Sequence, residues 1–203
     1  IGQISPNVTL GATYQSKTRM SKFDKYAGLF AEQGDFDIPQ NYGIGIAVKA
    51  TPQLTIAADV VQIDYSDIAA VGNPLIFPPG AGQLLGNNGG SGFGWRDMTV
   101  LKLGASYEYS KALTMRAGYN YGRQPIPSSQ TFFNILAPGV MDHHLTLGAP
   151  WNMSPTTEVT MAYMHAFNKR VNGSGSIPAG FGAGEANLRM YQDSLGIAFG
   201  MKL

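Results

Sequence analysis

The stretch from Trp95 to Arg123 constrains the fold more than any other part of the chain. Apolar side chains alternate with small or polar ones from Leu101 to Tyr109 and again from Leu113 to Tyr121, with 110–112 between the two runs. A period of two places successive side chains on opposite faces of a β-strand. The stretch therefore predicts two antiparallel strands joined by a tight turn, in a sheet with one apolar and one polar face.

The apolar face of these two strands is aliphatic in the middle and carries tyrosine at its ends. Amphipathic rings in such positions are typical of strands that cross a bilayer, where they lie at the level of the head groups. At ~3.3 Å per residue and a tilt near ~40°, the run from Leu113 to Arg123 rises roughly 28 Å, and an outer-membrane apolar band is about 25 Å tall. We therefore expect strands that span a membrane and turn their polar face to a lumen.

Composition supports this interpretation and excludes several other classes of protein. Charged residues make up 13% of the chain, against about 25% in soluble domains. No run approaches the ~18 apolar residues of a membrane helix, so a helical span is excluded. A net charge of +1 gives no electrostatic footprint for nucleic acid, and the absence of cysteine excludes disulfides and thiolate metal sites.

The same alternation recurs along the chain and predicts about eight antiparallel strands. The other apolar runs begin at Val8, Tyr42, Leu54, Leu145, Val159 and Leu195, and the last of them ends at Leu203. After Val60 the apolar phase moves to Val61, Ile63 and Tyr65, which predicts a β-bulge near that point. The fold class we expect is an all-β, antiparallel transmembrane β-barrel.

The predicted connections alternate between short and long. Short ones occupy 50–53, 110–112 and 152–156, whereas long ones rich in Gly, Pro and Asn occupy 16–41, 66–94, 124–139 and 168–186. Outer-membrane barrels have short periplasmic turns and long extracellular loops, so we expect a periplasmic C-terminus. This orientation places one ring of aromatic residues near the outer rim (Tyr42, Tyr65, Trp95, Tyr121 and Phe167) and another near the inner rim (Tyr107, Tyr109 and Trp151).

The long loops are unusually apolar. Residues 21–33 predict a short amphipathic helix, and the two following loops add aliphatic and aromatic side chains. The residues that we predict to form a surface for capturing hydrophobic molecules are Phe23, Tyr26, Leu29, Phe30, Leu75, Ile76, Phe77, Phe132, Phe133, Ile135 and Leu136. The alternative is that these side chains pack against one another and the barrel rim, as the side chains of compact loops do.

Several unlinked stretches resemble one known family. The run GFGWRDMTVLKLGASYEYSKALTMRAGYNYGRQPIPSSQTFFNILAPGV is similar to the C-terminal half of the FadL/TodX family of outer-membrane transporters of long-chain fatty acids and hydrocarbons. Supporting pieces are LGATYQSKTRMSKFDKYAGLF, FDIPQNYGIGIAVK and IAADVVQIDYSDI. The resemblance implies a barrel of about fourteen strands, plugged by an N-terminal hatch, with hydrophobic substrate captured outside and released sideways into the membrane.

On this resemblance, residues 1–203 are the C-terminal portion of one barrel domain, without the hatch and the early strands. We expect a monomer in the outer membrane of a Gram-negative cell, in contact with its lipid and lipopolysaccharide. The expected partner is a hydrophobic small molecule, with no nucleic acid. Neither a cofactor nor a metal is implied.

The charged residues of the predicted lumen face have two interpretations. They are Asp59, Lys102, Glu108, Arg116, Glu158 and Lys202. Mutual pairing across the interior is one, because single buried charges are costly. The other is that Lys102 or Arg116 binds a substrate carboxylate, in the case of Arg116 by bidentate hydrogen bonds.

Catalysis is not expected. Asp142, His143, His144 and His165 could suggest a metal site or a catalytic dyad, but the chain has neither H-E-x-x-H nor G-x-S-x-G spacing. Adjacent histidines on a strand point to opposite faces, so His143 and His144 cannot bind one ligand together.

The function that we predict is passive transport of hydrophobic small molecules, such as long-chain fatty acids or hydrocarbons, through the barrel lumen. One alternative is a structural or adhesive barrel whose long loops bind a surface partner. A soluble lipocalin-like carrier is another, and it requires the apolar face of the sheet to point inward.

Overall fold

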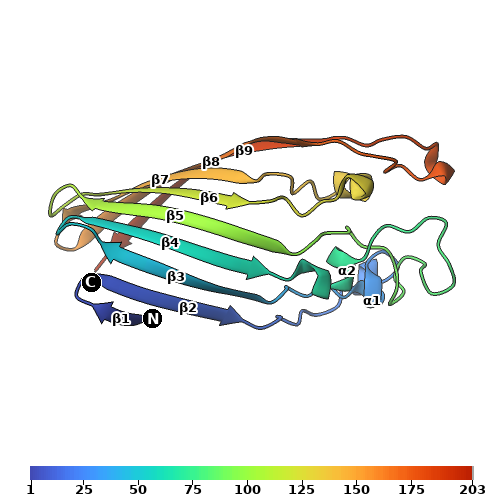
Figure 1. The fold of residues 1–203 in the computed structure, drawn as a ribbon, viewed down its shortest axis with the longest axis horizontal. Helices are drawn as coiled ribbons and strands as arrows, with labels where there is room; N and C mark the ends of the chain where they lie inside the picture. The colour runs from blue at the N-terminus through green and yellow to red at the C-terminus, as the bar shows by residue number, and fades with distance from the viewer. Residues whose placement is uncertain (203) are drawn as a thin grey trace.

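A computed structural model describes residues 1–202 as one nine-stranded antiparallel sheet in which every strand pairs with the next along the chain (Figure 1). Each strand follows from the period-two pattern of its sequence. The strands are β1 (Gly2–Ser5), β2 (Val8–Gln15), β3 (Asn41–Lys49), β4 (Leu54–Ile63), β5 (Met98–Glu108), β6 (Thr114–Gly122), β7 (His143–Ser154), β8 (Thr157–Val171) and β9 (Leu188–Met201).

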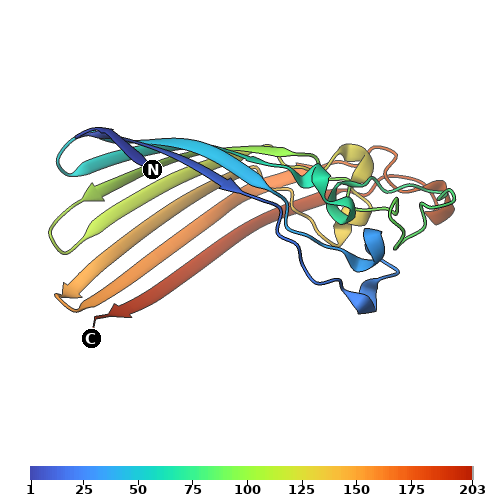
Figure 2. The same cartoon turned by 90° about the horizontal axis from the view of Figure 1, so that it is seen from below.

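The two ends of the sheet differ. Short turns gather at one end, and the long loops with all the short helices gather at the other (Figures 1 and 2). The sheet is curved, and β1 and β9 form its two edges, because no pairing joins them within residues 1–202. The predicted alternation of short and long connections is therefore confirmed, in a barrel wall that this part of the chain does not close.

The large apolar side chains project from one face of the sheet and are not covered. Leu103, Leu147 and Ile197 expose 58%, 48% and 72% of their surface. On the opposite face, Lys102, Asn120 and His144 lie side by side across β5, β6 and β7. A sheet that leaves its apolar face open needs a nonaqueous environment on that side, which fits acyl chains outside a barrel and a polar lumen inside. We refer to these as the outward and the inner face.

The helix predicted over 21–33 is wrong. The segment contains only η1 (Asp24–Tyr26) and α1 (Ala31–Gly34), and Glu32 and Gln33 have positive φ angles of 55° and 59°. Their backbone N–H groups donate to carbonyl oxygens of Asn87 and Gly86 in the next loop instead of to their own turn. Hydrogen bonds to another loop have replaced those of a local helix.

The remaining short helices are η2 (Tyr65–Asp67), α2 (Ala69–Gly72), η3 (Ser128–Gln130), η4 (Phe133–Ile135) and η5 (Ala179–Phe181). Within the part of the chain that the structure describes, no helix is long and apolar enough to cross a membrane.

Two details of the strands differ from expectation. The sequence predicts about eight strands and misses β1, which is only four residues long. The bulge predicted near Val60 is also wrong, because β4 pairs without a register shift on both sides. Val61 and Ile63 are apolar residues of the inner face, close to the loops. Leu203 lies outside the described residues.

A bulge does occur in β8, between Ala166 and Lys169, and it carries that strand on to Val171. The loop predicted to begin at Asn168 therefore begins later. Val171 and its partner Leu188 are buried with Ile126 and Val140 in the main hydrophobic core. This core lies beneath the loops and not between two layers of the sheet.

The outer aromatic ring is smaller than predicted. Tyr42, Tyr121 and Phe167 are exposed on the outward face, but Tyr65 and Trp95 pack on each other, with ring centroids 5.1 Å apart. Burial raises the pKa of the Tyr65 hydroxyl above its ordinary value. These two rings stabilise the loops and are not available to the lipid head groups.

Candidate functional site

The four long loops form one connected assembly at their end of the sheet. The first loop bonds to the second through the Gln33 side-chain amide, which donates to the Gly86 carbonyl and to Asn88 Oδ1 at 3.1 and 2.9 Å. The fourth joins the third where the Thr131 hydroxyl donates to the Ala186 carbonyl at 2.7 Å. The loops are thus held in place relative to one another.

Asn134 joins the second and third loops and is completely buried. Its side-chain oxygen accepts from Trp95 Nε1 at 2.6 Å, and its amide nitrogen donates to the carbonyls of Phe93 and Gln130 at 2.6 and 2.8 Å. Beside it, the rings of Phe93 and Phe133 stack with centroids 5.0 Å apart. Sequence reasoning missed the role of Asn134, because a polar residue in a loop is ordinarily solvated.

Three rings from three different loops meet at the loop surface, and we call them the aromatic bridge: Phe77, Phe132 and Phe181. The centroid of Phe181 lies 5.1 Å from that of Phe77 and 5.5 Å from that of Phe132. Phe77 and Phe181 nevertheless expose 44% and 59% of their surface. The structure thus brings together two predicted residues, and it adds Phe181, a lone aromatic among glycines that the sequence does not single out.

A second cluster lies within the first loop. Phe30 contacts Phe36, Phe23 and Tyr26, at centroid distances of 5.1, 6.2 and 6.3 Å. Phe23 and Tyr26 remain 46% and 55% exposed. The loop is closed at its base by Lys17 Nζ, which lies 3.3 Å from Asp37 Oδ2.

Asp37 is nearly buried at that closure. Burial acts to raise the pKa of its carboxyl group, but the Met20 backbone N–H and the Lys17 ammonium outweigh burial and leave this pKa below its ordinary value. Asp37 is therefore ionised and helps to fix the loop that carries the second cluster.

The other predicted capture residues divide into two groups. Leu29, Leu75, Ile76 and Phe133 are half-buried supports of the loops. Ile135 and Leu136 are 57% and 69% exposed. Instead of one continuous surface, the loops present two aromatic clusters and an exposed aliphatic pair, so some of these side chains pack within the loops while others stay exposed.

The two predicted lumen cations lie on the inner face but line different hollows. Lys102 borders a hollow of about 420 Å³ together with Asp59, Gly43 and Gly45. Arg116 borders another, of about 410 Å³, with Thr55, Thr146 and Thr160. Both hollows are lined largely by small side chains, which leaves room above the sheet.

The expected mutual pairing of lumen charges is not found among residues 1–202. Asp59 lies directly opposite Lys102 in the register, yet the two form no ion pair. The Asp59 carboxylate leans the other way, over Gly45, where a Cβ atom would collide with it. The ammonium of Lys102 and the guanidinium of Arg116 are therefore not engaged by a carboxylate of the described chain.

A different charge pair supports the inner face near the loops. Lys169 Nζ lies 2.6 Å from Asp142 Oδ2, and the Asp142 side chain is only 6% exposed. Its other oxygen is buried without a hydrogen-bond partner among the described residues. The pair holds the upper part of β8 to the start of β7.

We expect Lys169→Met to lower the free energy of unfolding by about 1–2 kcal/mol, because it leaves a nearly buried carboxylate without its cation, while the exposed ammonium limits the loss. Urea unfolding of the complete protein, followed by tryptophan fluorescence, measures the change. The double variant with Asp142→Asn should recover part of the loss. An unchanged unfolding midpoint in the single variant would show that the pair contributes nothing.

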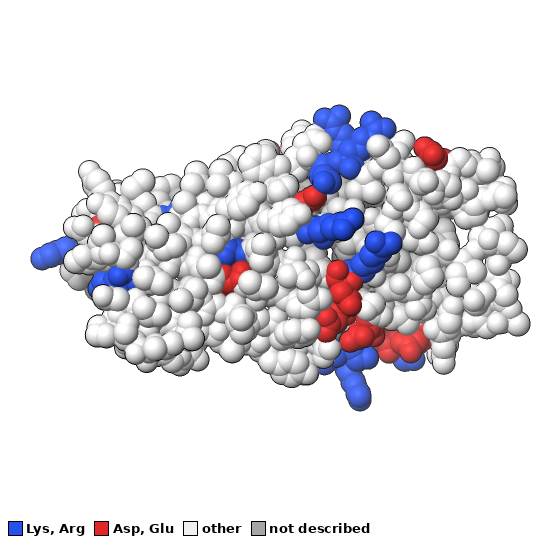
Figure 3. All heavy atoms as spheres, viewed as in Figure 1, with Lys and Arg blue, Asp and Glu red and all other residues white. Residues whose placement is uncertain are grey.

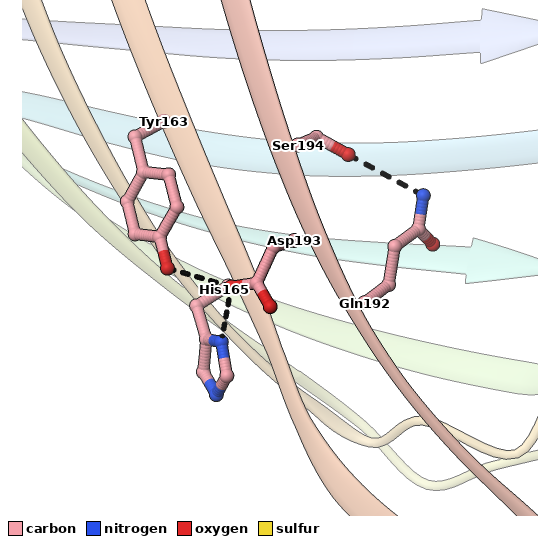
Figure 4. A network of polar contacts seen from close by, with 5 residues as sticks. All are labelled: Tyr163, His165, Gln192, Asp193 and Ser194. Atoms are coloured by element: carbon pink, nitrogen blue, oxygen red, sulfur yellow. Dashed lines mark hydrogen bonds and ion pairs between the residues drawn. The ribbon is translucent and has the colours of Figure 1, made fainter.

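The adjacent histidines lie on opposite faces, as predicted, with His144 on the inner face and His143 on the outward face. His143 Nδ1 shares a hydrogen bond of 2.5 Å with the Tyr119 hydroxyl on the outward face. His165, also outward, contacts Asp193 Oδ1 at 2.7 Å, and the same oxygen accepts from the Tyr163 hydroxyl at 2.6 Å (Figure 4). Sequence reasoning missed Asp193, because a carboxylate on an outward face breaks the polar-in pattern.

The shared acceptor of this network is the carboxylate of Asp193, which lies opposite His165 in the register. Its hydrogen bonds to Tyr163 and His165 compensate a carboxylate placed on the apolar face. Among residues 1–202 no three side chains of His, Cys, Asp or Glu gather as metal ligands would.

Comparisons with solved structures agree with this geometry. The fold is similar to the Pseudomonas putida toluene transporter TodX, with a TM-score of 0.61 and 16% identity over 98% of this chain and 47% of that one. It is also similar to a Pseudomonas aeruginosa FadL homologue, with a TM-score of 0.62 and 20% identity over 96% and 48% of the two chains. For the monoaromatic hydrocarbon channel CymD the TM-score is 0.56, with 17% identity over 98% and 49%.

The chain thus spans about half the length of each of these solved relatives. A comparison with curated proteins gave no match. The sequence matches one protein family over residues 2–202, and that family is a group of outer-membrane transport proteins, not of enzymes. On this match, together with the open wall of antiparallel strands, the chain belongs to the outer membrane protein transport protein family (OMPP1/FadL/TodX).

Proposed function

We propose that the complete protein carries hydrophobic small molecules passively across the outer membrane, and that this chain supplies the C-terminal part of its single barrel domain together with a loop surface that captures them. The observation that carries the proposal is the aromatic bridge, in which Phe181 packs on Phe77 and on the half-buried Phe132, while Phe77 and Phe181 themselves remain exposed. Family membership and the outward apolar face of the sheet support it.

The driving force is transfer of apolar area from water. Each 100 Å² of substrate surface covered by the rings contributes about 2.5 kcal/mol. The hydrogen bonds between the loops keep the rings in place before substrate arrives, which lowers the entropic cost of binding. A monoaromatic or aliphatic hydrocarbon needs nothing beyond these contacts.

For a fatty acid, Lys102 and Arg116 are the proposed anchors, since neither is engaged by a carboxylate among residues 1–202. They line separate hollows, so they would hold the carboxylate in succession and not together. The barrel orientation that goes with this route places the loops outside the cell and the end of β9 in the periplasm, with the protein acting as a monomer.

The test is uptake of a radiolabelled hydrocarbon or long-chain fatty acid by cells that produce the complete protein. Replacing Phe77, Phe132 and Phe181 with serine should lower uptake at least tenfold, because the apolar contact offered by the aromatic bridge is removed. Leu84→Ser, in the same loop as Phe77 and 56% exposed, is the matched control and should leave uptake within about twofold.

Unchanged uptake in the triple variant, with normal amounts of protein in the membrane, would contradict capture by the aromatic bridge. Loss of binding to other cells or surfaces, with uptake unaffected, would favour the adhesive barrel instead.

A further inference from the structure

Four arginines lie where strands enter the loops: Arg96, Arg123, Arg170 and Arg189. All four are exposed, and none forms an ion pair with a carboxylate among residues 1–202. Figure 3 shows charged side chains gathered in a band between the strands and the loops, while most of the strand surface carries none. This band is the level at which a membrane's apolar layer ends.

Two of the arginines border a crevice of about 690 Å³. Its polar side includes Arg96, Arg123 and the serines 128 and 129, together with Asp97, whose carboxylate accepts a hydrogen bond from the Ser66 backbone N–H at 2.9 Å. Leu101 and Tyr121, which pair across β5 and β6, form its apolar side. Because Leu101 and Tyr121 belong to the outward face, the crevice opens toward the lipid and not only toward the lumen.

The other two arginines lie directly opposite each other across β8 and β9. Like charges in such a cross-strand pair are destabilising unless something neutralises them. Their neighbour Lys169 points the other way and is neutralised by Asp142. Arg189 Nε donates only to the neutral Asn168 side chain, at 3.2 Å, so the pair still lacks an anion.

Aromatic residues on the same two strands indicate the depth of the Arg170–Arg189 pair in the membrane. Phe167 precedes it on β8 and Tyr191 follows it on β9, and both rings are exposed, by 42% and 63%. Such rings mark the interface between acyl chains and head groups. This opposed pair therefore lies at the level of the head groups, where lipid phosphates are within reach.

We propose that this arginine belt (Arg96, Arg123, Arg170 and Arg189) binds the phosphorylated sugar head group of lipid A, the membrane anchor of lipopolysaccharide. Planar guanidinium groups match phosphate oxygens with bidentate hydrogen bonds. The polar side of the crevice takes phosphate and sugar, and Leu101 and Tyr121 take the beginning of an acyl chain. The proposal rests on outer-membrane placement and not on transport.

The amphipathic lining argues for a lipid over a second copy of the chain. A protein partner would need carboxylates at the head-group level and would leave the acyl-lined side of the crevice unfilled. A lipid with two phosphates can place one in the crevice and the other at the Arg170–Arg189 pair. The nearest strands of the two sites, β6 and β8, are two apart in the sheet, which separates them by roughly 10 Å.

The experiment uses the complete protein in detergent, titrated with bisphosphorylated lipid A and, separately, with lipid A from which both phosphates have been removed. The wild type should bind the phosphorylated form at least tenfold more tightly. The triple variant R123Q/R170Q/R189Q should bind both forms equally weakly. Lys111→Gln, in the short turn at the opposite end of the sheet, removes one exposed charge and should change nothing.

Equal affinity of the wild type for the two lipids would overturn the proposal, and this result needs no variant to fold. An equal loss of affinity for phosphorylated lipid A in Lys111→Gln would also overturn it, because binding would then depend on overall charge and not on the arginine belt. Unchanged lipid binding together with a shift from dimer to monomer in the triple variant would also overturn it, in favour of a second copy. Uptake by the Phe77, Phe132 and Phe181 variant is measured separately, so failure of the transport proposal stays distinguishable.

Discussion

Ala58→Arg is expected to lower the free energy of unfolding in a bilayer by about 2–4 kcal/mol, the cost of an arginine at the midplane of a barrel's lipid face. Ala58 is the fifth of ten residues in β4 and lies between Ile46 and Leu103 on the outward face. The new guanidinium group would have to enter acyl chains or bend toward a distant head group.

The preceding residue offers a closely matched control. Ala57 has the same side chain and nearly the same depth, but it lies between Ala47 and Gly104 and borders the inner hollow beside Asp59. Ala57→Arg should therefore cost less than about 1 kcal/mol. Urea titration of both variants of the complete protein in lipid vesicles measures the difference. Equal costs would refute the assignment of the two faces.

The second large effect is expected at Asn134. Asn134→Ala should destabilise the loop assembly by about 3 kcal/mol, because it leaves Trp95 Nε1 and the Phe93 carbonyl without their partner in a buried site, and each such group costs about 1–3 kcal/mol. The strands should stay folded, since Asn134 and its hydrogen-bond partners Trp95, Phe93 and Gln130 all lie in loops. Amide hydrogen exchange of residues 64–97 and 123–142 measures the change.

Asn88→Ala serves as the comparison, because Asn88 accepts from Gln33 at an exposed position. Asn88→Ala should change the free energy of loop opening measured by hydrogen exchange by less than about 1 kcal/mol, since water replaces the missing hydrogen bond. If residues 64–97 and 123–142 kept the same protection from hydrogen exchange in Asn134→Ala, the loops would be held by ring packing alone. Loss of protection in the strands as well would mean that loops and wall unfold together.

The separation of apolar and polar side chains onto two faces could be predicted from local pattern. Leu103 and Lys102 are neighbours in the chain, and a pleated strand turns neighbours to opposite faces whatever surrounds it. The predicted turn at 110–112 follows for the same reason, since two alternating runs separated by three residues leave only a tight connection.

The loops could not be predicted in the same way. Gln33 and Asn134 take their roles from partners more than fifty and about forty residues away, and no periodicity encodes those distances. The helix expected at 21–33 failed because bonds to Gly86 and Asn87 were available. Phe181 was missed because its neighbouring rings come from two other loops, and Asp193 because its partners lie across the pairing of β8 and β9.

By itself, then, the sequence determined the class of fold and the two faces of the wall, because these depend on the alternation of adjacent side chains. Only the tertiary structure decided which rings stay exposed, which charges remain unpaired and where the arginines gather. Those properties depend on loops and strands that are distant in the chain and meet only when the sheet curves.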